Sequence, residues 1–517
     1  MRIQNSVFCL LFSVFYLLSS PSFSQYTKYW IQFTDKNNNP YSVSTPSAFL
    51  SPRAIQRRTN QSIAVVQNDL PITPAYYNSV KNVPNVTIIN RSKWFNAVTI
   101  YTTDATALTT INNFSFVLNT KPVQRYHRKF GIEENVAPVL TSNFKLQTSN
   151  SSYNYGPSFN QINMIGGVCL HTQGFHGEGM VIAIMDAGFY KADSLSVFDS
   201  LRLNNQILGT WDFVDNDTMV YDVHPHGSYV LSTMGGNLPG MIVGTAPKAN
   251  YYLLRTEQGA TEYIIEEDNW VSAAEFADSA GADVFTTSLG YTDFDDSTQN
   301  HTYADMDGNT ARISIATDMA VSKGIFAVCS AGNSGNSPWN FIGAPADADS
   351  VLAIGAVDSL GNYASFSSNG PTADGRVKPN VAAQGQAAVV TDLDTSIAYL
   401  SGTSFSGPIT AGAVACLWQA HPSATNMQVF NAIEQSASQF ANPDTLLGYG
   451  ISDFCAANIL LTSTEEVQGA GCRVQVYPNP STGQFRIKDL GGRVYELEIY
   501  NVMGEKVYQS PNSELQT

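Results

Sequence analysis

The stretch SGTSFSGP, residues 401–408, is a run of small residues that leads into the apolar segment ITAGAVACLWQA, residues 409–420. The apolar segment is predicted to form a buried helix, so Ser404 would lie where an irregular turn enters that helix. A hydroxyl at that position is close to backbone N–H groups that have no partner within the helix and that favour a developing negative charge. Taken alone, the stretch is better explained as a serine N-cap, which is common before helices.

Upstream of this stretch, short apolar runs alternate with segments of helical periodicity. The apolar runs have the length of buried strands and occupy residues 181–185, 251–254, 283–287, 325–328 and 351–355. The helical segments between them include residues 228–234, 271–279 and 310–322. Strands that alternate with helices predict an α/β fold with a doubly wound parallel sheet. In such sheets, ligands bind beyond the carboxyl ends of the strands.

Three further polar residues are predicted to lie at that edge. Asp186 follows the first apolar run, His226 stands near a predicted helix start, and Asn333 follows the strand at 325–328 between small residues. Singly, each is explained as a loop or surface residue, and His224 is a rival for the role of His226. Together with Ser404 they supply an orienting carboxylate, a base, an oxyanion donor and a nucleophile. The combination favours a serine hydrolase.

Length and charge restrict the classes of protein to consider. The chain has 517 residues, too many for one ordinary core, so two to four domains are expected. Charged residues make up only 14 % of the chain and the net charge is −16. This balance argues against a nucleic-acid partner and against a basic membrane-binding patch.

Residues 1–24 are predicted to form a secretory signal peptide. Arg2 gives a positive start, residues 7–18 form an apolar run too short to span a bilayer, and Ser22 and Ser24 place small residues at the cleavage positions. An uncleaved anchor is the alternative. No other stretch is long and apolar enough to cross a membrane, so none is expected to do so after signal cleavage.

The remaining ends of the chain are predicted to form separate units. Residues 25–129 are expected to be a small α+β domain, with strands at 28–33, 86–89 and 97–101 and helices at 46–61 and 73–80. Residues 130–164 are interpreted as a linker and the start of the next domain, and 462–471 as a second linker. Residues 472–517 alternate like the strands of a small all-β tail, at 473–477, 484–487, 494–500 and 506–508.

Five cysteines lie outside the signal segment, and their wide spacing matches neither a disulfide framework nor a zinc site. Cys329 and Cys416 lie in apolar runs and are expected to be buried thiols. Any bridge would have to come from Cys169, Cys455 and Cys472, and the sequence does not choose among them.

These segments resemble the motifs of the subtilisin-like serine proteases, the subtilase family. The matching blocks include VIAIMDAGF, HGSYVLS, TTSLG, AVCSAGNSG and SGTSFSGP, with GTAPKANYYLLR and AIGAVDSLGNYASFSSNGP as further blocks. The resemblance assigns a catalytic domain to residues 165–461. The histidine motif departs from the family's usual HGTHVAG, and the serine motif from GTSMAxP, but neither change removes a catalytic group.

The resemblance implies a secreted serine endopeptidase with the triad Asp186, His226 and Ser404 and the oxyanion donor Asn333. It further implies a specificity pocket walled by Ser288, Leu289, Gly290, Ala331 and Gly332, with Gly343 at its floor. Residues 287–290 are expected to form an edge strand that pairs with extended substrate backbone. The absence of charged residues from this pocket set favours a large apolar side chain before the scissile bond.

The same resemblance suggests partners and a route of export. Residues 25–129 would be the inhibitory, chaperoning propeptide, so the expected partners are protein or peptide substrates and the chain's own propeptide. The tail blocks YPNPSTGQFRI and LEIYNVMGEKVY are similar to part of the β-sandwich C-terminal sorting domain of type IX secretion in Bacteroidetes. No cofactor is required for the chemistry and no metal ligand is assigned, although family members often bind structural calcium.

Three alternatives remain open. A catalytically silent subtilisin-like surface or binding protein would keep the fold without turnover. An esterase would need a G-x-S-x-G elbow and the order Ser, Asp, His, whereas here the order is Asp, His, Ser and Ser406 replaces the second glycine. An acid-acting relative would carry a Glu/Asp pair and an acidic oxyanion residue, where this chain has Asn333.

Overall fold

A computed structural model describes residues 26–125, residues 153–465 and four short strands of the tail. The predicted signal peptide and most of the predicted linker at 130–164 lie outside the described residues. The chain divides into two compact units, Met1–Ala457 and Asn458–Thr517, and each is considered by itself.

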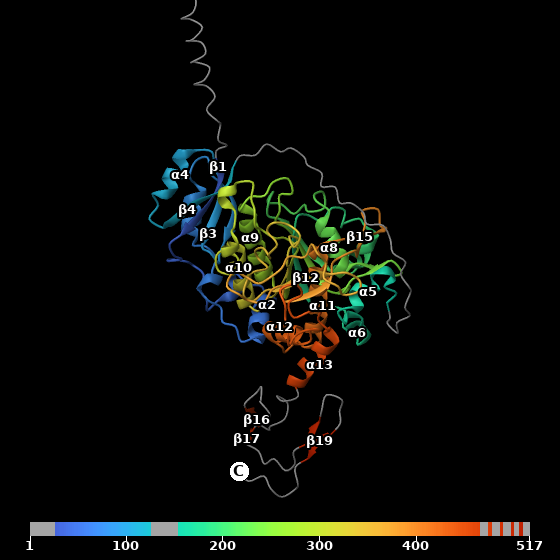
Figure 1. The fold of residues 1–517 in the computed structure, drawn as a ribbon. Coiled ribbons are helices and arrows are strands. Elements are labelled where there is room, and N and C mark those ends of the chain that lie inside the picture. The colour runs from blue at the N-terminus through green and yellow to red at the C-terminus, as the bar shows by residue number, and fades with distance from the viewer. Residues whose placement is uncertain are drawn as a thin grey trace, which may run out of the picture. The chain divides into compact units, whose positions relative to one another are not determined.

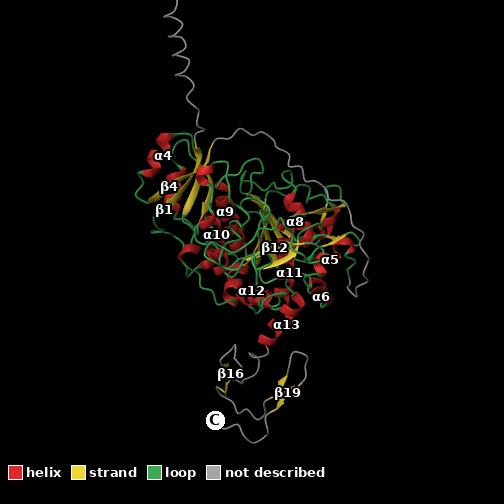
Figure 2. Ribbon diagram, viewed as in Figure 1, coloured by secondary structure: helices red, strands yellow, loops and turns green. Residues whose placement is uncertain are grey.

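The first unit is built on a seven-stranded parallel sheet, which confirms the predicted α/β class (Figures 1 and 2). Its strands are, in spatial order, β13 (Val381–Gln384), β12 (Leu352–Val357), β11 (Phe326–Ser330), β10 (Val284–Thr287), β5 (Val181–Asp186), β9 (Asn250–Arg255) and β6 (Ile207–Asp212). The two outermost strands were not predicted. Strand β6 has a glycine and mostly half-buried positions, and β13 reads VAAQ, so neither forms a strongly apolar run.

Helices cover both faces of the sheet, as a doubly wound fold requires. On one side, α8 (His226–Gly235) packs against α11 (Thr403–Ala420), which also contacts β10 to β13. On the other, α9 (Ile265–Ala280) packs against α10 (Arg312–Ser322). Alternate residues of β5 are buried toward α9 and α10: Val181, Ala183 and Met185 belong to the same core cluster as Trp270 and Phe285.

The N-terminal part, residues 26–125, forms a four-stranded antiparallel sheet. Its order is β2 (Thr87–Ser92), β3 (Ala97–Tyr101), β1 (Tyr26–Phe33) and β4 (Val117–Arg125), with helices α2 (Pro52–Asn60), α3 (Pro74–Lys81) and α4 (Ala105–Asn112). The single helix predicted at 46–61 is instead a 3-10 turn, Pro46–Ala48, followed by α2. Ser51 caps α2 by accepting a hydrogen bond from Ala54 N, and Pro52 stands at the first helical position, so the helix starts there.

This N-terminal domain contacts helix α9 through two buried acids. Glu275 accepts three hydrogen bonds from consecutive residues, namely Ser92 Oγ at 2.5 Å, Lys93 N at 2.6 Å and Trp94 N at 2.9 Å. One turn further along, Asp278 pairs with three cations of the N-terminal domain: Arg57 at 2.6 Å, Arg58 at 3.0 Å and Lys93 at 3.0 Å. These cations keep the pKa of Asp278 below its usual range although the carboxylate is fully buried.

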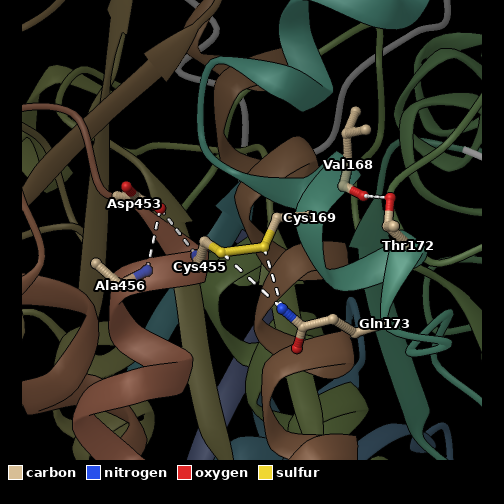
Figure 3. Close-up of a disulfide and its surroundings, with 7 residues drawn as sticks. All are labelled: Val168, Cys169, Thr172, Gln173, Asp453, Cys455 and Ala456. Carbon is tan, nitrogen blue, oxygen red and sulfur yellow. Dashed lines mark hydrogen bonds between the residues drawn. A yellow bond between two sulfur atoms is a disulfide. The ribbon is translucent and has the colours of Figure 1, made fainter. Parts of the chain in front are cut away.

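A disulfide joins Cys169 in α6 (Gly167–Thr172) to Cys455 in α13 (Phe454–Glu465), across 286 positions of sequence (Figure 3). Asp453 Oδ1 accepts the N–H groups of Cys455 and Ala456 and so caps α13 beside the bridge. The sequence left open which two of Cys169, Cys455 and Cys472 form a bridge, and the structure pairs the first two. Cys472 lies outside the described residues. Cys329 and Cys416 are buried free thiols, as predicted, and burial raises the pKa of both.

The second unit contributes two antiparallel strand pairs near the predicted positions. Strand β16 (Val474–Tyr477) pairs with β17 (Arg486–Asp489), and β18 (Glu498–Tyr500) pairs with β19 (Lys506–Gln509). Throughout the part of the chain that the structure describes, no helix has the length and apolarity needed to span a bilayer.

Candidate active site

Asp186 is the last residue of β5, near the middle of the sheet at its carboxyl edge. Its side chain is fully buried, and Oδ1 accepts a hydrogen bond from Ala187 N at 2.7 Å. The same oxygen lies 2.8 Å from Nδ1 of His226. Burial of a carboxylate without a partner is costly, so this contact with the imidazole explains how the acid is tolerated there.

His226 is the first residue of α8, where the chain comes close to the loop after β5. Gly227 N donates to Gly188 O at 2.9 Å, and a Cβ atom on Gly227 would collide with that carbonyl oxygen, so only glycine allows this approach. The rival His224 accepts the backbone N–H of His226 at 3.3 Å, and the two rings are 6.3 Å apart. His226 is therefore the histidine that contacts the aspartate.

Ser404 is the second residue of α11. The helix begins six residues before the apolar segment, residues 409–420, from which it was predicted. Pro408 lies four residues further on and has no N–H, so the carbonyl oxygen of Ser404 has no donor within the helix. The hydroxyl of Ser288 fills this place at 3.0 Å. Ser404 Oγ lies 3.4 Å from Ser288 O, and the ring of the next residue, Phe405, is 6.3 Å from the imidazole of His226.

The amide of Asn333 has a fixed orientation. Its Oδ1 accepts hydrogen bonds from Thr403 N at 2.8 Å and Thr403 Oγ1 at 3.0 Å. Among the described residues, Nδ2 donates to no protein group, so its hydrogens are available to a ligand. Gly332 precedes it with φ +107°, a conformation that favours glycine.

Asn333 and Ser404 line the same cavity, which has a volume of about 140 Å³. All six residues predicted for the specificity pocket also line it: Ser288, Leu289, Gly290, Ala331, Gly332 and Gly343. Trp339 and Phe341 add aromatic walls that the sequence argument missed, because they lie in an irregular loop without a motif. No lining residue is charged.

The prediction of an edge strand at 287–290 is wrong. Strand β10 lies between β5 and β11 inside the sheet and ends at Thr287. Ser288–Gly290 continue beyond the sheet's edge, and Tyr291 then pairs with Ala344 through an N–H to carbonyl bond of 2.8 Å. A local run of residues does not encode the order of strands in a parallel sheet, which is why the sequence could not place this segment.

The last strand of the N-terminal domain ends beside this site. Gln124 of β4 donates from Nε2 to Gln258 Oε1 at 2.9 Å, and Val123 is buried against Tyr263. Gln258 lies two residues beyond Thr256, whose N–H donates to the carbonyl oxygen of Asp186 at 2.9 Å. The chain therefore leaves the N-terminal domain close to the carboxyl edge of the parallel sheet.

Comparison with known proteins agrees with this arrangement. Residues 177–450, more than half of the chain, match the model of the Subtilase family. Residues 28–135 match the Peptidase S8 propeptide domain of Bacteroidota, and residues 475–517 match the Secretion system C-terminal sorting domain. The last match indicates a protein that is secreted or carried to the cell surface by type IX secretion.

Similar proteins include Subtilisin E of Bacillus subtilis (strain 168), 31 % identical over 287 residues that cover 54 % of this chain and 66 % of the relative. The chain thus spans just under two thirds of that relative's length. Subtilisin of Bacillus pumilus is 31 % identical over 54 % of this chain and 90 % of its own length. Thermitase of Thermoactinomyces vulgaris is 30 % identical over 53 % of this chain and 86 % of its own length. From its fold, its site geometry and these matches, the chain belongs to the subtilase family.

Proposed function

We propose that this protein is a secreted serine endopeptidase that uses Asp186, His226 and Ser404 as its catalytic triad. The observation that carries the proposal is the 2.8 Å contact between His226 Nδ1 and Asp186 Oδ1, next to a cavity lined by Ser404 and Asn333. It is supported by the membership of the family and by the order of the three residues along the chain.

In the proposed reaction, Ser404 Oγ attacks the carbonyl carbon of the scissile peptide bond while His226 Nε2 takes the hydroxyl proton. Asp186 accepts a hydrogen bond from Nδ1, fixes the imidazole tautomer and stabilises the imidazolium. His226 then gives its proton to the leaving amine, and the C–N bond breaks to leave an ester on Ser404. Water attacks this ester with His226 as base again, which releases the acid and restores the serine.

The negative charge that develops on the substrate oxygen would be stabilised by Asn333 Nδ2 and by the backbone N–H of Ser404. The first turn of α11 leaves that N–H without a helical acceptor, and the bonds from Thr403 to Asn333 Oδ1 leave the amide donors free. In a subtilisin, a relative of this chain, removal of one such side-chain donor costs about 2.7–4 kcal/mol of transition-state stabilisation. We expect a loss of similar size for Asn333→Ala.

The cavity of about 140 Å³ would bind the side chain before the scissile bond. Its aromatic walls and its lack of charged groups favour a large apolar side chain at that position. The N-terminal domain would act as the intramolecular inhibitor, since β4 ends beside Asp186 and α9. A peptide-library profile led by arginine or lysine before the cut would contradict the assignment of the pocket.

The decisive test is peptidase activity of Ser404→Ala, with Ser406→Ala as the matched control. Ser406 lies one position beyond Phe405, and its hydroxyl donates within the helix to Thr403 O at 3.1 Å. We expect Ser404→Ala to abolish both turnover and labelling by a fluorophosphonate, and Ser406→Ala to retain both. An unmodified chain that neither turns over peptides nor takes the label would favour the silent binding protein.

A second pair of variants tests the choice of histidine. His226→Ala removes the group that contacts Asp186, whereas His224→Ala removes a ring that accepts the backbone N–H of His226. Turnover should be lost only in the first variant. The reverse result would assign the base to His224.

A further inference from the structure

Three glutamates converge where the chain passes from β9 to α9. Glu257 follows the strand, Glu262 lies in the connection, and Glu266 is in the first turn of the helix. One carboxylate oxygen from each lies within 4.8 Å of the other two. Glu257 and Glu266 are buried, with 7 % and 1 % of their surfaces exposed, and Glu262 is half-buried at the rim.

The charge of Lys28 interacts with Glu266 across space, without a direct ion pair between the two side chains. Within the described residues, none of the three glutamates forms an ion pair with lysine, arginine or histidine. The Tyr291 hydroxyl and Thr256 Oγ1 bond Glu257, and Gln258 N bonds Glu266 Oε1 at 2.9 Å. Glu266 also shares hydrogen bonds with the carboxyl groups of Glu257 and Glu262. The structure therefore concentrates three acids that have no direct ion-pair partner among the described residues.

One oxygen of the group is unused. Glu266 Oε2 is buried and receives no hydrogen bond from an N–H or hydroxyl group among the described residues, although the neighbouring Oε1 receives one. A buried carboxylate oxygen without a donor is costly, so this position would favour a positively charged ligand. Because Glu266 belongs to the mutually close set, the unused oxygen lies in the same place as the other two acids.

The separation of the oxygens suits a hard divalent cation. Calcium binds carboxylate oxygens at about 2.3–2.6 Å, so two ligands on opposite sides of one ion are about 4.6–5.2 Å apart. Oxygens that are all within 4.8 Å of one another can therefore share one calcium sphere. Glu262, at the rim, leaves a side open to water, which would complete the coordination.

We propose that Glu257, Glu262 and Glu266 form a binding site for one divalent cation of the calcium type. The proposal does not depend on the peptidase activity, because it concerns the stability of the fold. Burial is the main cause that raises the pKa of Glu257 to about 7 and that of Glu262 to about 8. The nearby charge of Asp186 adds to the first shift and that of Glu257 to the second.

A cation at this place would brace the walls of the cleft. Glu257 follows Thr256, which bonds the carbonyl oxygen of Asp186, and it also accepts the hydroxyl of Tyr291. Tyr291 directly follows Ser288–Gly290, which line the candidate specificity cavity. The ion would thus connect the segment behind the candidate acid with the segment beside the pocket.

The test uses the full chain with Ser404→Ala, which removes self-digestion as a variable. Thermal unfolding and calorimetric titration are measured with CaCl2 at pH 8.5, with NaCl at equal ionic strength as the control for screening. At a calcium concentration about 100-fold above the dissociation constant, we expect the midpoint to rise by about 3 °C relative to NaCl. Titration should show one binding event that is lost in the variants below.

Glu262→Gln and Glu266→Gln each remove one charged ligand and should weaken calcium binding at least about tenfold, which is the usual scale for a change in a metal site. The matched control is Asp193→Asn, an exposed acid outside the group, which should keep the full response. Without calcium, both glutamine variants should unfold at or above the midpoint of the parent, because a buried repulsion has been reduced. This second measurement separates lost binding from lost folding.

Two results would overturn the proposal. The first is a midpoint that responds no more to CaCl2 than to NaCl. The second is a calcium response that both glutamine variants retain in full, because the ion would then bind elsewhere. Both results leave the peptidase assignment untouched, since that assignment is tested by turnover.

Discussion

The hydroxyl of Ser288 donates a hydrogen bond of 3.0 Å to the carbonyl oxygen of Ser404, at the point where Pro408 deprives that oxygen of its helical donor. The proline of the serine motif removes a hydrogen-bond donor, and the serine beside the pocket replaces it. Pro408 opens the first turn of α11, and Ser288 satisfies the group that is left over. The link fixes the distance between the candidate nucleophile and the wall of its pocket.

Ser288→Ala should therefore destabilise the protein and lower turnover. The carbonyl oxygen of Ser404 would be buried without a donor, which costs about 1–3 kcal/mol. The measurement is urea unfolding in the Ser404→Ala chain, together with kcat of the active chain. Ser288→Thr retains a hydroxyl and should recover most of the loss. If the alanine variant were as stable as the parent, the hydrogen bond would have no energetic role.

Gly227→Ala should disrupt the position of His226. The added methyl group would be driven into the carbonyl oxygen of Gly188, so either the helix start or the loop after Asp186 must move. Overpacking of this kind costs about 1–3 kcal/mol or more, and the displaced imidazole should reduce kcat strongly. Gly209→Ala in β6 is the control, since its methyl group would make ordinary contact, 3.4 Å, with Tyr252. Equal activity in the two variants would contradict the steric argument.

Asp278→Asn should destabilise the contact between the N-terminal domain and α9. Removal of one carboxylate leaves Arg57 buried at the interface without its ion-pair partner and leaves Arg58 paired with Asp69 alone, and breaking a buried pair in this way costs about 3–5 kcal/mol. Thermal unfolding of the full Ser404→Ala chain measures the effect. Asp199→Asn is the control, because its partner Arg202 is on the surface, where a pair contributes about 0–1 kcal/mol. Similar losses in both variants would show that burial is irrelevant here.

His171 should make the fold sensitive to acid. Its Nε2 lies 2.9 Å from Thr245 O, which can only accept, so Nε2 carries the proton and Nδ1 accepts from the Tyr155 hydroxyl. Burial lowers the pKa of His171 to about 4, below its unfolded value of 6.5, so the unfolded state binds more protons between these values. The contribution to stability is therefore complete above pH 6.5 and is lost as the pH falls toward 4, by about 3 kcal/mol in all.

His171→Asn provides the measurement for this prediction. It keeps a polar side chain but cannot titrate, so the free energy of unfolding should fall less between pH 7 and pH 4.5 than in the parent. The comparison is made by urea unfolding of Ser404→Ala chains at both pH values. Parallel pH profiles in parent and variant would assign the acid sensitivity to other groups.

Much of the fold and of the site follows from local pattern. The five runs that form the inner strands of the sheet are rich in apolar and β-branched residues. The four polar residues follow strand ends or helix starts, where parallel sheets bind ligands. Their convergence could be predicted for this reason. The helix start at Thr403 was missed by six residues because a proline and two glycines hide the first turns.

The remainder depends on contacts between distant segments. Contacts between segments that lie far apart in the sequence set the strand order, including the interior position of β10. Such contacts also determine that Cys455 is the partner of Cys169. Glu257, Glu262 and Glu266 are spaced five and four apart across a strand end, a loop and a helix, so no single helical or strand period connects all three. Only the three-dimensional fold brings their carboxylates together.

The bridge between Cys169 and Cys455 lies wholly on one side of residues 126–152, and residues 25–168 contain no cysteine. A single backbone nick within 126–152 would therefore yield two covalently independent pieces without any reductant. The larger piece would keep α6 and α13 tied together, while the smaller would be retained only by reversible association. The two pieces would then dissociate on dilution alone.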